Sequence, residues 1–342
     1  MRHAERHASS LSSDPSFFMR LALDEAWRYQ LLTYPNPAVG AVVAGSCGEV
    51  IAVAAHREAG GPHAEVLAIR DAYAVLSGDD SLSACEDAVT LHERLPRLAK
   101  KLFSDKTIVV TLEPCNHTGR TPPCASLIEK LGFQRVVIGA MDPNPTAAGG
   151  AERLKNAGMD VVTGVEKEAC EALLWPFVTW QRSGRFLFFK LAQSLNGVID
   201  GGTISSETSR RWVHAVREKI DWLVIGGETV RTDRPRLDAR LTGGQAPDVA
   251  IFTRRPGTIE RSIPLFSVPG RKVVCTETLP EKGLVMVEGG AGTFAALQEA
   301  IDGMVLFVAP FVKEGMGYNG AKNFTILHRR QSGADTMLWL KA

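Results

Sequence analysis

The chain has 342 residues and a formal net charge of +1 at pH 7, with 45% hydrophobic and 23% charged residues. This length suits about two domains, and the composition is that of ordinary globular proteins. Long nucleic acids and anionic membrane surfaces favour basic proteins, so a charge of +1 argues against both as partners. No apolar run approaches the ~20 residues that span a bilayer, and residues 1–16 lack the apolar centre of a secretory signal. We therefore expect a cytoplasmic protein without nucleic-acid or membrane partners, and we also expect homo-oligomers.

The first half of the sequence alternates between helical and strand patterns. After a segment, 1–14, that we predict to be disordered, Asp14 and Pro15 have the pattern of an N-cap and first helical turn. Helical patterns also begin at His63 and Cys124. Short apolar runs predict strands at 39–44, 50–55, 107–112 and 135–140. This alternation indicates an α/β domain over 15–165. Within it, the polar, helix-like segment 71–106 resembles an insertion and predicts a surface loop.

A second α/β series follows a predicted linker at 166–184. A new strand begins just after the linker, in FLFFKLA, and opens a domain over 185–342. The further strand candidates are 222–227, 249–253, 272–275, 284–290 and 304–310. Seven arginines lie between Arg210 and Arg240. Such a cluster is typical of a solvated helix face, and it is also typical of a site that binds a small anionic substrate.

The six cysteines favour free thiols or metal ligands over a disulfide framework, because the cytoplasm is reducing. Four of them stand alone in the sequence and are expected to be buried or incidental thiols: Cys47, Cys85, Cys170 and Cys275. The other two, Cys115 and Cys124, lie in the stretch TLEPCNHTGRTPPC at 111–124.

His63, Cys115 and Cys124 stand at the ends of predicted helices and strands and have the ligand types that zinc prefers. Three protein ligands leave a fourth position for water, whose pKa zinc lowers from 15.7 to about 7. A carboxylate is still needed to move protons, and Glu65, two residues from His63, is placed for that role. A closed structural site would need a fourth ligand, for which His117 is the nearest candidate. The zinc-deaminase signature H-x-E followed by P-C-x-x-C is matched except that eight residues separate the cysteines here.

Four stretches resemble the bifunctional riboflavin-biosynthesis deaminase-reductases: YPNPAVGAVV, HREAGGPHAEVLAIR, TLEPCNHTGRTPPC and MDPNPTAAGG. In that family the eight-residue gap between the cysteines is usual. The resemblance implies a cytidine-deaminase-like α/β/α domain with the three residues above as zinc ligands and Glu65 as the catalytic proton carrier. It also implies a substrate pocket lined by Asn36, His56, His117, Arg120 and Asn144. The chain departs from the family at 116–118, where Asn-His-Thr replaces the common Ser-His-Tyr.

The second half contains VEGGAGT, which predicts a strand, a glycine-rich turn and a helix start, an arrangement that can receive phosphate. An ordinary tight turn would use the same glycines. Together with FFKLAQSLNGVID and IGGETVRTDRPRLDARL, this stretch resembles the reductase half of the same family, which is similar in fold to dihydrofolate reductase and uses NADPH. The implied cofactor-binding residues are Ala192, Thr229, Asp233, Gly290, Ala291, Gly292, Thr293, Phe294, Ala295 and Ala296. The implied substrate-binding residues are Arg217, Leu237, Arg240 and Glu288, and Lys190 is the implied catalytic cation.

One departure concerns Asn196, where the family commonly has aspartate in Ser-Leu-Asp-Gly; Asp200 is a candidate to compensate. Our main hypothesis is zinc-dependent deamination of a phosphorylated pyrimidine, 2,5-diamino-6-(5-phosphoribosylamino)pyrimidin-4(3H)-one, followed by NADPH-dependent reduction of its ribosyl group to ribityl. Zn²⁺ and NADPH are then the cofactors. Two alternatives stay open: a base or nucleoside deaminase with an inactive second domain, and a non-catalytic zinc-stabilised scaffold.

Overall fold

The computed structural model describes residues 14–119, 121–318 and 321–342. The chain divides into two compact units, Met1–Trp175 and Pro176–Ala342. Their boundary falls inside helix α7 (Lys167–Ser183), so the segment that we expected to be a linker is helical. Of the predicted disordered segment 1–14, only Asp14 lies among the described residues, and it caps the first helix.

The first unit is built on a five-stranded sheet in the order β2-β1-β3-β4-β5. β1 runs antiparallel to β2 and β3, whereas β3, β4 and β5 are parallel. The strands are β1 (Gly40–Ala44), β2 (Val50–Ala55), β3 (Thr107–Leu112), β4 (Arg135–Ala140) and β5 (Asp160–Thr163). The four predicted strands are confirmed. The fifth was missed because it is a short edge strand without a buried residue.

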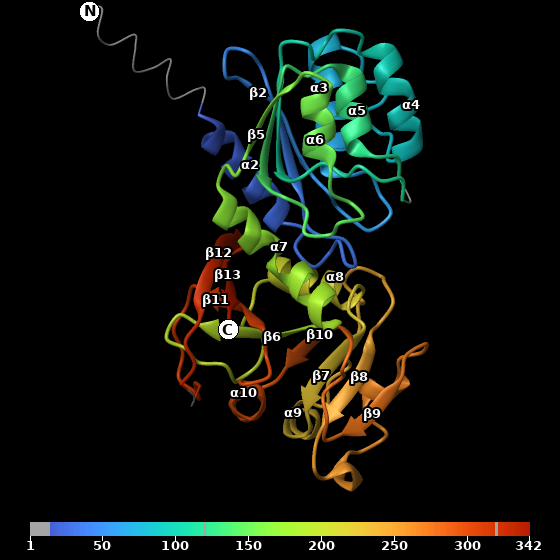
Figure 1. Ribbon diagram of the computed structural model, residues 1–342. Coiled ribbons are helices and arrows are strands. Elements are labelled where there is room, and N and C mark those ends of the chain that lie inside the picture. The colour runs from blue at the N-terminus through green and yellow to red at the C-terminus, as the bar shows by residue number, and fades with distance from the viewer. Residues whose placement is uncertain (1–13, 120, 319–320) are drawn as a thin grey trace, which may run out of the picture. The chain divides into compact units, whose positions relative to one another are not determined.

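Helices cover both faces of this sheet (Figure 1). The predicted helix starts are confirmed: Asp14 Oδ1 accepts a hydrogen bond from the Ser16 amide at 2.9 Å, and His63 and Cys124 begin two further helices. α3, α4, α5 and α6 form one layer, and α2 packs on the opposite face. Their bounds are α2 (Pro15–Trp27), α3 (Ala64–Ser77), α4 (Ala88–Leu98), α5 (Cys124–Leu131) and α6 (Gly150–Asn156).

The helix-like character expected for segment 71–106 is confirmed, but its expected place as a surface insertion is wrong. The segment completes α3, forms α4 and supplies side chains to the core, including Leu91, Leu95 and Phe103, all of which are fully buried. Phe103 stacks on Phe133 with the ring centroids 4.8 Å apart. In α4, apolar residues at helical spacing, such as Leu91 and Leu95, form the buried face. The charged residues between them made this pattern hard to recognise in the sequence.

The second unit is built on an eight-stranded sheet in the order β12-β13-β11-β6-β10-β7-β8-β9. The six strands from β11 to β9 in this order are parallel, and β13 and β12 add an antiparallel hairpin beside β11. The strands are β6 (Arg185–Ser194), β7 (Trp222–Gly226), β8 (Asp248–Phe252), β9 (Val273–Thr276), β10 (Gly283–Glu288), β11 (Gly303–Ala309), β12 (Thr325–Ser332) and β13 (Asp335–Lys341). All predicted strands are confirmed. The hairpin was missed because β12 is polar and only its last residue is buried.

Among its described residues, the α-helices that lie wholly within this unit are α8 (Glu207–Arg217), α9 (Gly227–Asp233) and α10 (Ala291–Leu297). The sheet centre is apolar on both faces: Leu187, Phe189 and Val287 are buried on one face, and Phe188 and Met286 are buried on the other. Such continuous apolar runs are typical of parallel strands covered on both sides.

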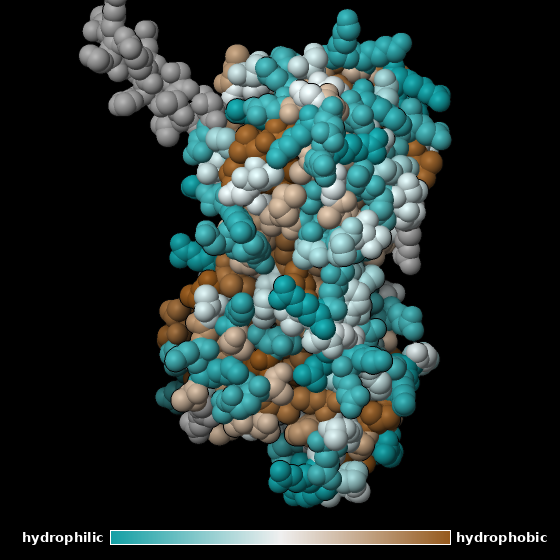
Figure 2. All heavy atoms as spheres, in the orientation of Figure 1, coloured by the Kyte–Doolittle hydropathy of each residue, from teal (hydrophilic) through white to brown (hydrophobic). Residues whose placement is uncertain are grey.

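Polar side chains occupy most of the face seen in Figure 2, with apolar groups in smaller patches. Over the described ranges, no helix combines the length and the apolar character that crossing a bilayer requires.

We predict that Phe103→Ala lowers the free energy of unfolding of the first unit by about 3–5 kcal/mol, because it empties a buried aromatic site. Urea denaturation of the full chain measures this change. Val89→Ala, at a position in the same segment with 46% of its surface exposed, is the matched control and should change stability by less than about 0.5 kcal/mol. Equal, small effects of both substitutions would contradict a core role for the segment.

Candidate functional site

The three predicted metal ligands converge at the ends of three elements of the first unit. His63 is the N-cap of α3, Cys124 is the first residue of α5, and Cys115 lies three residues beyond β3. His63 Nδ1 lies 3.3 Å from Cys124 Sγ and 3.7 Å from Cys115 Sγ. All three ligand atoms lie within 4.8 Å of one another. The fold therefore brings two sulfurs and one imidazole nitrogen around one point.

This spacing fits zinc. Zinc–sulfur bonds of about 2.3 Å and zinc–nitrogen bonds of about 2.0–2.1 Å at a tetrahedral angle separate nitrogen from sulfur by about 3.6 Å. The pKa of Cys115 is lowered to about 4, chiefly by the hydrogen bond from the Cys124 side chain, with His63 adding to the effect against burial. A thiolate is the form of cysteine that binds metal. The neighbours of Cys115 thus favour its thiolate, whereas the hydrogen bond that it shares with Cys124, together with burial, raises the pKa of Cys124.

His117 does not complete the cluster. Within 14–119, 121–318 and 321–342, the group of His, Cys, Asp and Glu side chains able to hold a metal here comprises the three ligands above and no fourth. The Nδ1 atom of His117 is buried without a hydrogen-bond partner among those residues. Arg120, which we expected in the substrate pocket, lies outside the described residues.

Glu65 lies in the first turn of α3 and is 3% exposed. Burial raises the pKa of its carboxyl to about 7, although the neighbouring His63 opposes the rise. A carboxyl that titrates near neutrality can both accept and donate a proton, which is what general acid–base catalysis requires. The carboxyl interacts with all three ligand residues, and its role as the proton carrier stays a prediction.

His56 and Asn36 form a hydrogen-bonded pair beside the cluster. Burial lowers the pKa of His56 to about 4, so the ring is neutral at physiological pH. Its Nδ1 donates to the Pro62 carbonyl at 3.0 Å, which leaves Nε2 to accept from Asn36 Nδ2 at 3.1 Å. The His56 ring also contacts the His63 ring edge to face, with centroids 5.4 Å apart. The orientation of the Asn36 amide is therefore fixed next to the metal ligands.

Glu113 was not identified from the sequence. It follows β3 directly and is 3% exposed. It accepts two backbone N–H groups from the loop after β4, which contains Asn144, and a third from the first turn of α6. Asn144 itself accepts the Thr146 amide through Oδ1 at 3.1 Å. A carboxylate at the end of an otherwise apolar strand, TIVVTLE, was the available signal.

The second unit has its own charged site where the carboxyl end of β10 meets the middle of β6. Lys190 and Glu288 pair in register across these strands, with Nζ 3.5 Å from Oε2. Arg217 of α8 places Nη2 2.8 and 3.0 Å from the two carboxylate oxygens of Glu288. Burial alone would raise the pKa of Glu288, but the charges of Arg217 and Lys190 outweigh it and lower the pKa to about 2. Glu288 is therefore an ionised carboxylate between two cations.

Arg217 uses most of its donors inside the protein, since Nη1 also donates to the Asp238 carbonyl at 3.0 Å. Arg240 and Arg236 instead flank the Asp238 carboxylate, at 2.6 and 2.5 Å, and keep 60% and 50% of their side-chain surfaces exposed. Neither Asp238 nor Arg236 was identified from the sequence, although both lie in the RPRLDAR stretch that carried the resemblance. Leu237, which we predicted to bind substrate, stands between Arg236 and Asp238 in the sequence, and its side chain is buried.

The residues expected to bind the cofactor gather at the same edge of the second sheet. Ala192 lies on β6, Thr229 and Asp233 lie on α9, and Gly290 to Ala296 form the turn after β10 and the first residues of α10. The end of β7 and the start of α10 lie close together: a Cβ atom on Gly226 would lie 2.1 Å from Thr293 Oγ1, so glycine permits this approach without a shift of Thr293. In open α/β sheets, ligands bind outside the carboxyl ends of the strands, which is where these segments lie.

Asn196 connects two loops at this edge. Its Nδ2 donates to the Lys313 carbonyl at 2.9 Å, and its Oδ1 accepts the Lys313 amide at 3.2 Å and the Ser194 hydroxyl at 2.7 Å. Asp200 adds to the same connection, because Oδ1 accepts the Met316 amide at 3.1 Å. An amide can both donate and accept here, which an aspartate cannot.

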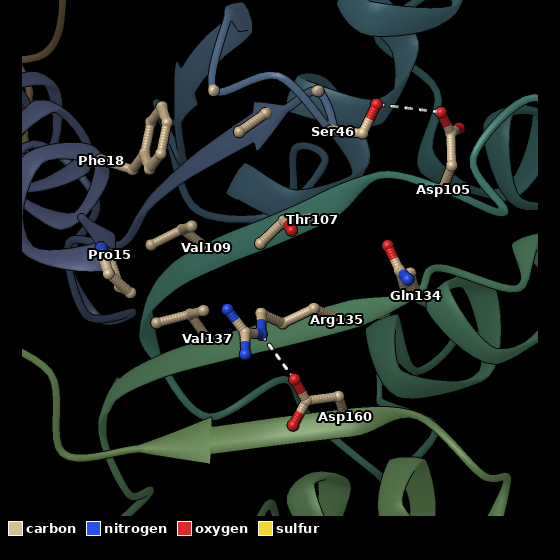
Figure 3. A pocket seen from close by; sticks show the side chains of 13 residues that line it. Pro15, Phe18, Ser46, Asp105, Thr107, Val109, Gln134, Arg135, Val137 and Asp160 are labelled. Carbon is tan, nitrogen blue, oxygen red and sulfur yellow. Dashed lines mark hydrogen bonds and ion pairs between the residues drawn. The ribbon is translucent and has the colours of Figure 1, made fainter. Parts of the chain in front are cut away.

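A cavity of about 340 Å³ in the first unit is separate from the metal cluster. It is lined by the start of α2, the β1–β2 turn and the amino ends of β3, β4 and β5, whereas the cluster lies beyond the carboxyl end of β3. Figure 3 shows two polar pairs in its wall, Arg135 with Asp160 and Ser46 with Asp105. None of the predicted site residues lines it.

Two family models match the chain in sequence. The cytidine and deoxycytidylate deaminase zinc-binding region matches residues 12–140, and the RibD C-terminal domain matches residues 185–283. The riboflavin biosynthesis protein RibD of Aquifex aeolicus is 32% identical over 334 residues, which cover 86% of each protein. The chain belongs to the RibD family. The Synechocystis RibD is 37% identical over 229 residues, which cover 65% of this chain and 55% of that protein.

Solved RibD structures agree with this assignment. A deaminase/reductase of Thermotoga maritima superposes with a TM-score of 0.65 at 27% identity, covering 96% of this chain and 98% of that one. The RibD of Acinetobacter baumannii gives 0.63 at 26% identity with the same coverage. The predicted architecture, a deaminase-like α/β domain followed by a reductase domain, is confirmed. The chain is accordingly a bifunctional enzyme of riboflavin biosynthesis, with a zinc-binding deaminase domain and a RibD reductase domain.

We predict that His117→Ala retains one zinc per chain, because His117 stands outside the ligand cluster. Cys124→Ala should lose most of the metal, since it removes one of three protein ligands. Elemental analysis of the purified full-length variants measures both. Loss of zinc from His117→Ala would show a fourth protein ligand and contradict the open site.

We also predict that Asn196→Asp loosens the two loops that Asn196 joins, because a carboxylate oxygen would face the Lys313 carbonyl. The loss of one hydrogen bond with an unsatisfied acceptor should cost about 1–3 kcal/mol locally. Hydrogen exchange of peptides covering 194–201 and 311–316 should become faster, whereas Asn323→Asp, at an exposed position, should leave it unchanged. Unchanged exchange in Asn196→Asp would show that the amide does not hold the loops.

Proposed function

We propose that the first unit deaminates 2,5-diamino-6-(5-phosphoribosylamino)pyrimidin-4(3H)-one and that the second reduces the ribosyl group of the product to ribityl with NADPH. The observation that supports this most strongly is the His63, Cys115 and Cys124 cluster with buried Glu65 beside it. The Thermotoga maritima relative is named a diaminohydroxyphosphoribosylaminopyrimidine deaminase/5-amino-6-(5-phosphoribosylamino)uracil reductase, which supports the choice of substrates.

In the deaminase unit, the three ligands would hold zinc, which lowers the pKa of a bound water to about 7. The Glu65 carboxylate takes a proton from the attacking water and delivers it to the departing amino nitrogen. Its burial beside the ligands keeps this transfer away from bulk solvent. A proton carrier at this place contributes typically about 10²–10⁴-fold to the rate.

Asn36 and neutral His56 orient the pyrimidine. The hydrogen bond from Asn36 Nδ2 to His56 Nε2 fixes the direction of the Asn36 amide. His117, with a buried and unpartnered Nδ1, offers a further polar contact to the substrate. Asn144 and Arg120 complete the proposed pocket.

In the reductase unit, NADPH supplies the hydride, and the chain supplies placement and charge. Lys190 steadies the negative charge that develops on the sugar oxygen, and Glu288 accepts hydrogen bonds from sugar hydroxyls. Arg217 holds Glu288 in place, which leaves the more exposed Arg240 to meet the phosphate. Leu237 borders this substrate site.

NADPH is proposed to bind along the carboxyl edge of the sheet. The residues that would hold it are Ala192, Thr229, Asp233, Gly290, Ala291, Gly292, Thr293, Phe294, Ala295 and Ala296. Their support is the close approach of the end of β7 to the start of α10.

The two alternatives from the sequence are less well supported. A scaffold would need a closed zinc site, and the ligand cluster holds only three suitable side chains within the described chain. A degenerate second unit would not be expected to retain an ionised Glu288 between Lys190 and Arg217.

We predict that Glu65→Gln and Lys190→Met separate the two activities. Glu65→Gln should reduce ammonia release from the phosphorylated diaminopyrimidine by about 10²–10⁴-fold, because the proton carrier is removed, while NADPH oxidation with the deaminated intermediate continues. Lys190→Met should have the reverse effect, with ammonia release unchanged. Ammonia release and absorbance at 340 nm follow the two steps.

Two exposed positions supply the matched controls, Glu58→Gln and Lys282→Met, and both variants should retain both activities. A wild-type chain that releases ammonia but oxidises no NADPH with the deaminated intermediate would favour the inactive second domain. Wild-type turnover by Glu65→Gln would remove this residue from the mechanism.

A further inference from the structure

Glu113 is a buried carboxylate with three hydrogen bonds to the backbone of one loop. Oε2 accepts the Asp142 amide at 3.2 Å, and Oε1 accepts the Gly149 and Ala151 amides, both at 3.0 Å. Only 3% of the residue is exposed. These donors lie at both ends of loop 141–151, by which we mean the connection from β4 to α6 together with the first two residues of α6. One side chain thus fixes the loop at its beginning and its end.

The same residue belongs to the chain segment that carries a metal ligand. Glu113 precedes Cys115 by two residues, and its amide donates to the Ala140 carbonyl at 2.9 Å, so it extends the pairing of β3 with β4. Its backbone is therefore anchored in the sheet independently of its carboxylate. The carboxylate then sets where loop 141–151 lies relative to Cys115.

Other contacts hold loop 141–151 against the segment that contains Cys115. The Asn116 amide donates to the Ala147 carbonyl at 3.0 Å. A Cβ atom on Gly150 would lie 1.9 Å from the Pro114 carbonyl oxygen, so the backbones approach as closely as glycine allows. Asn144 stands in the middle of the loop, between the two ends that Glu113 holds. Its backbone carbonyl accepts the Ala147 and Ala148 amides, which makes the loop a compact turn.

The chemistry of the contact requires a carboxylate. All three partners are N–H donors, and an ionised carboxylate accepts through both oxygens. A glutamine of nearly the same shape could keep Oε1 toward Gly149 and Ala151, but its NH₂ group would then face the Asp142 N–H. Two donors facing each other in a buried place would push the start of the loop away. The substitution therefore disturbs residues 142–144 and leaves the sheet intact.

We propose that Glu113 is a positioning residue for the deamination reaction, which presents Asn144 to the substrate by holding loop 141–151 against the metal-ligand segment. This proposal rests on the proposed function of the first unit, in which Asn144 lines the substrate pocket. Glu113 acts through the loop and touches neither the substrate nor the metal.

The test compares Glu113→Gln with the wild-type chain in ammonia release from the phosphorylated diaminopyrimidine. KM should rise about tenfold or more, with a smaller change in kcat, because the loss of a charge-assisted contact weakens substrate placement. Zinc content and the NADPH-dependent step should match those of the wild type, which shows that both units are folded. Deuterium uptake of a peptide covering 141–151 should rise.

Glu129→Gln is the matched control. Glu129 pairs with Arg153 of α6 near the same loop, at 2.7 Å, but about a third of each side chain is exposed. Such pairs contribute little, so KM should change less than about twofold.

A double-mutant cycle with Asn144→Ala distinguishes positioning from a general loss of stability. If Glu113 acts through Asn144, Glu113→Gln should raise KM far less when Asn144 is already alanine. Full additivity, unchanged KM and deuterium uptake in Glu113→Gln, or loss of zinc from that variant would each overturn the proposal. A wild-type chain that releases no ammonia from this substrate would instead overturn the proposed function, and the uptake of the 141–151 peptide would still report on Glu113.

Discussion

The structure of the first unit depends on the convergence of two sulfurs and one imidazole nitrogen on a single point. His63, Cys115 and Cys124 come from the starts of two helices and the end of one strand, with their ligand atoms within 4.8 Å of one another. His63 and Cys124 stand at helix starts, and Cys115 follows β3 by three residues, so the loop between the two cysteines is anchored near both ends. The neighbouring groups follow from this placement: Glu65 lies in the first turn of α3, and His56 packs against the ring of His63. The fold thus fixes the donors and their surroundings together.

In the second unit, the charged site is built around the carboxyl end of β10, beside the neighbouring parallel strand β6. The register of β6 and β10 brings Lys190 beside Glu288, and α8 adds Arg217. A buried carboxylate is costly unless it is paired, and two cations here keep it ionised. Arg217 was expected to bind substrate, but its side chain pairs with Glu288. Arg240 is the more exposed of the two arginines.

Much of this arrangement could be predicted from the sequence, and the failures have physical causes. The metal ligands and Glu65 were identified because their types and spacing carry the chemistry, and the strands because parallel strands are apolar throughout. The core role of Phe103 was missed because charged residues surround the apolar positions of its segment. Glu113 and Asp238 were missed because their partners are backbone amides and side chains brought near only by folding. The β12–β13 hairpin was missed because β12 has an exposed, polar pattern.

The central claim is that the cluster binds one zinc ion through three protein ligands and leaves a position for the reacting water. X-ray absorption spectroscopy of the zinc-loaded full-length protein tests it most directly, because sulfur and nitrogen or oxygen neighbours differ in distance from zinc by about 0.2–0.3 Å. The account predicts two sulfur neighbours, one imidazole nitrogen and one oxygen from solvent. A second imidazole or a third sulfur in the coordination shell, or a protein that takes up no zinc, would contradict it.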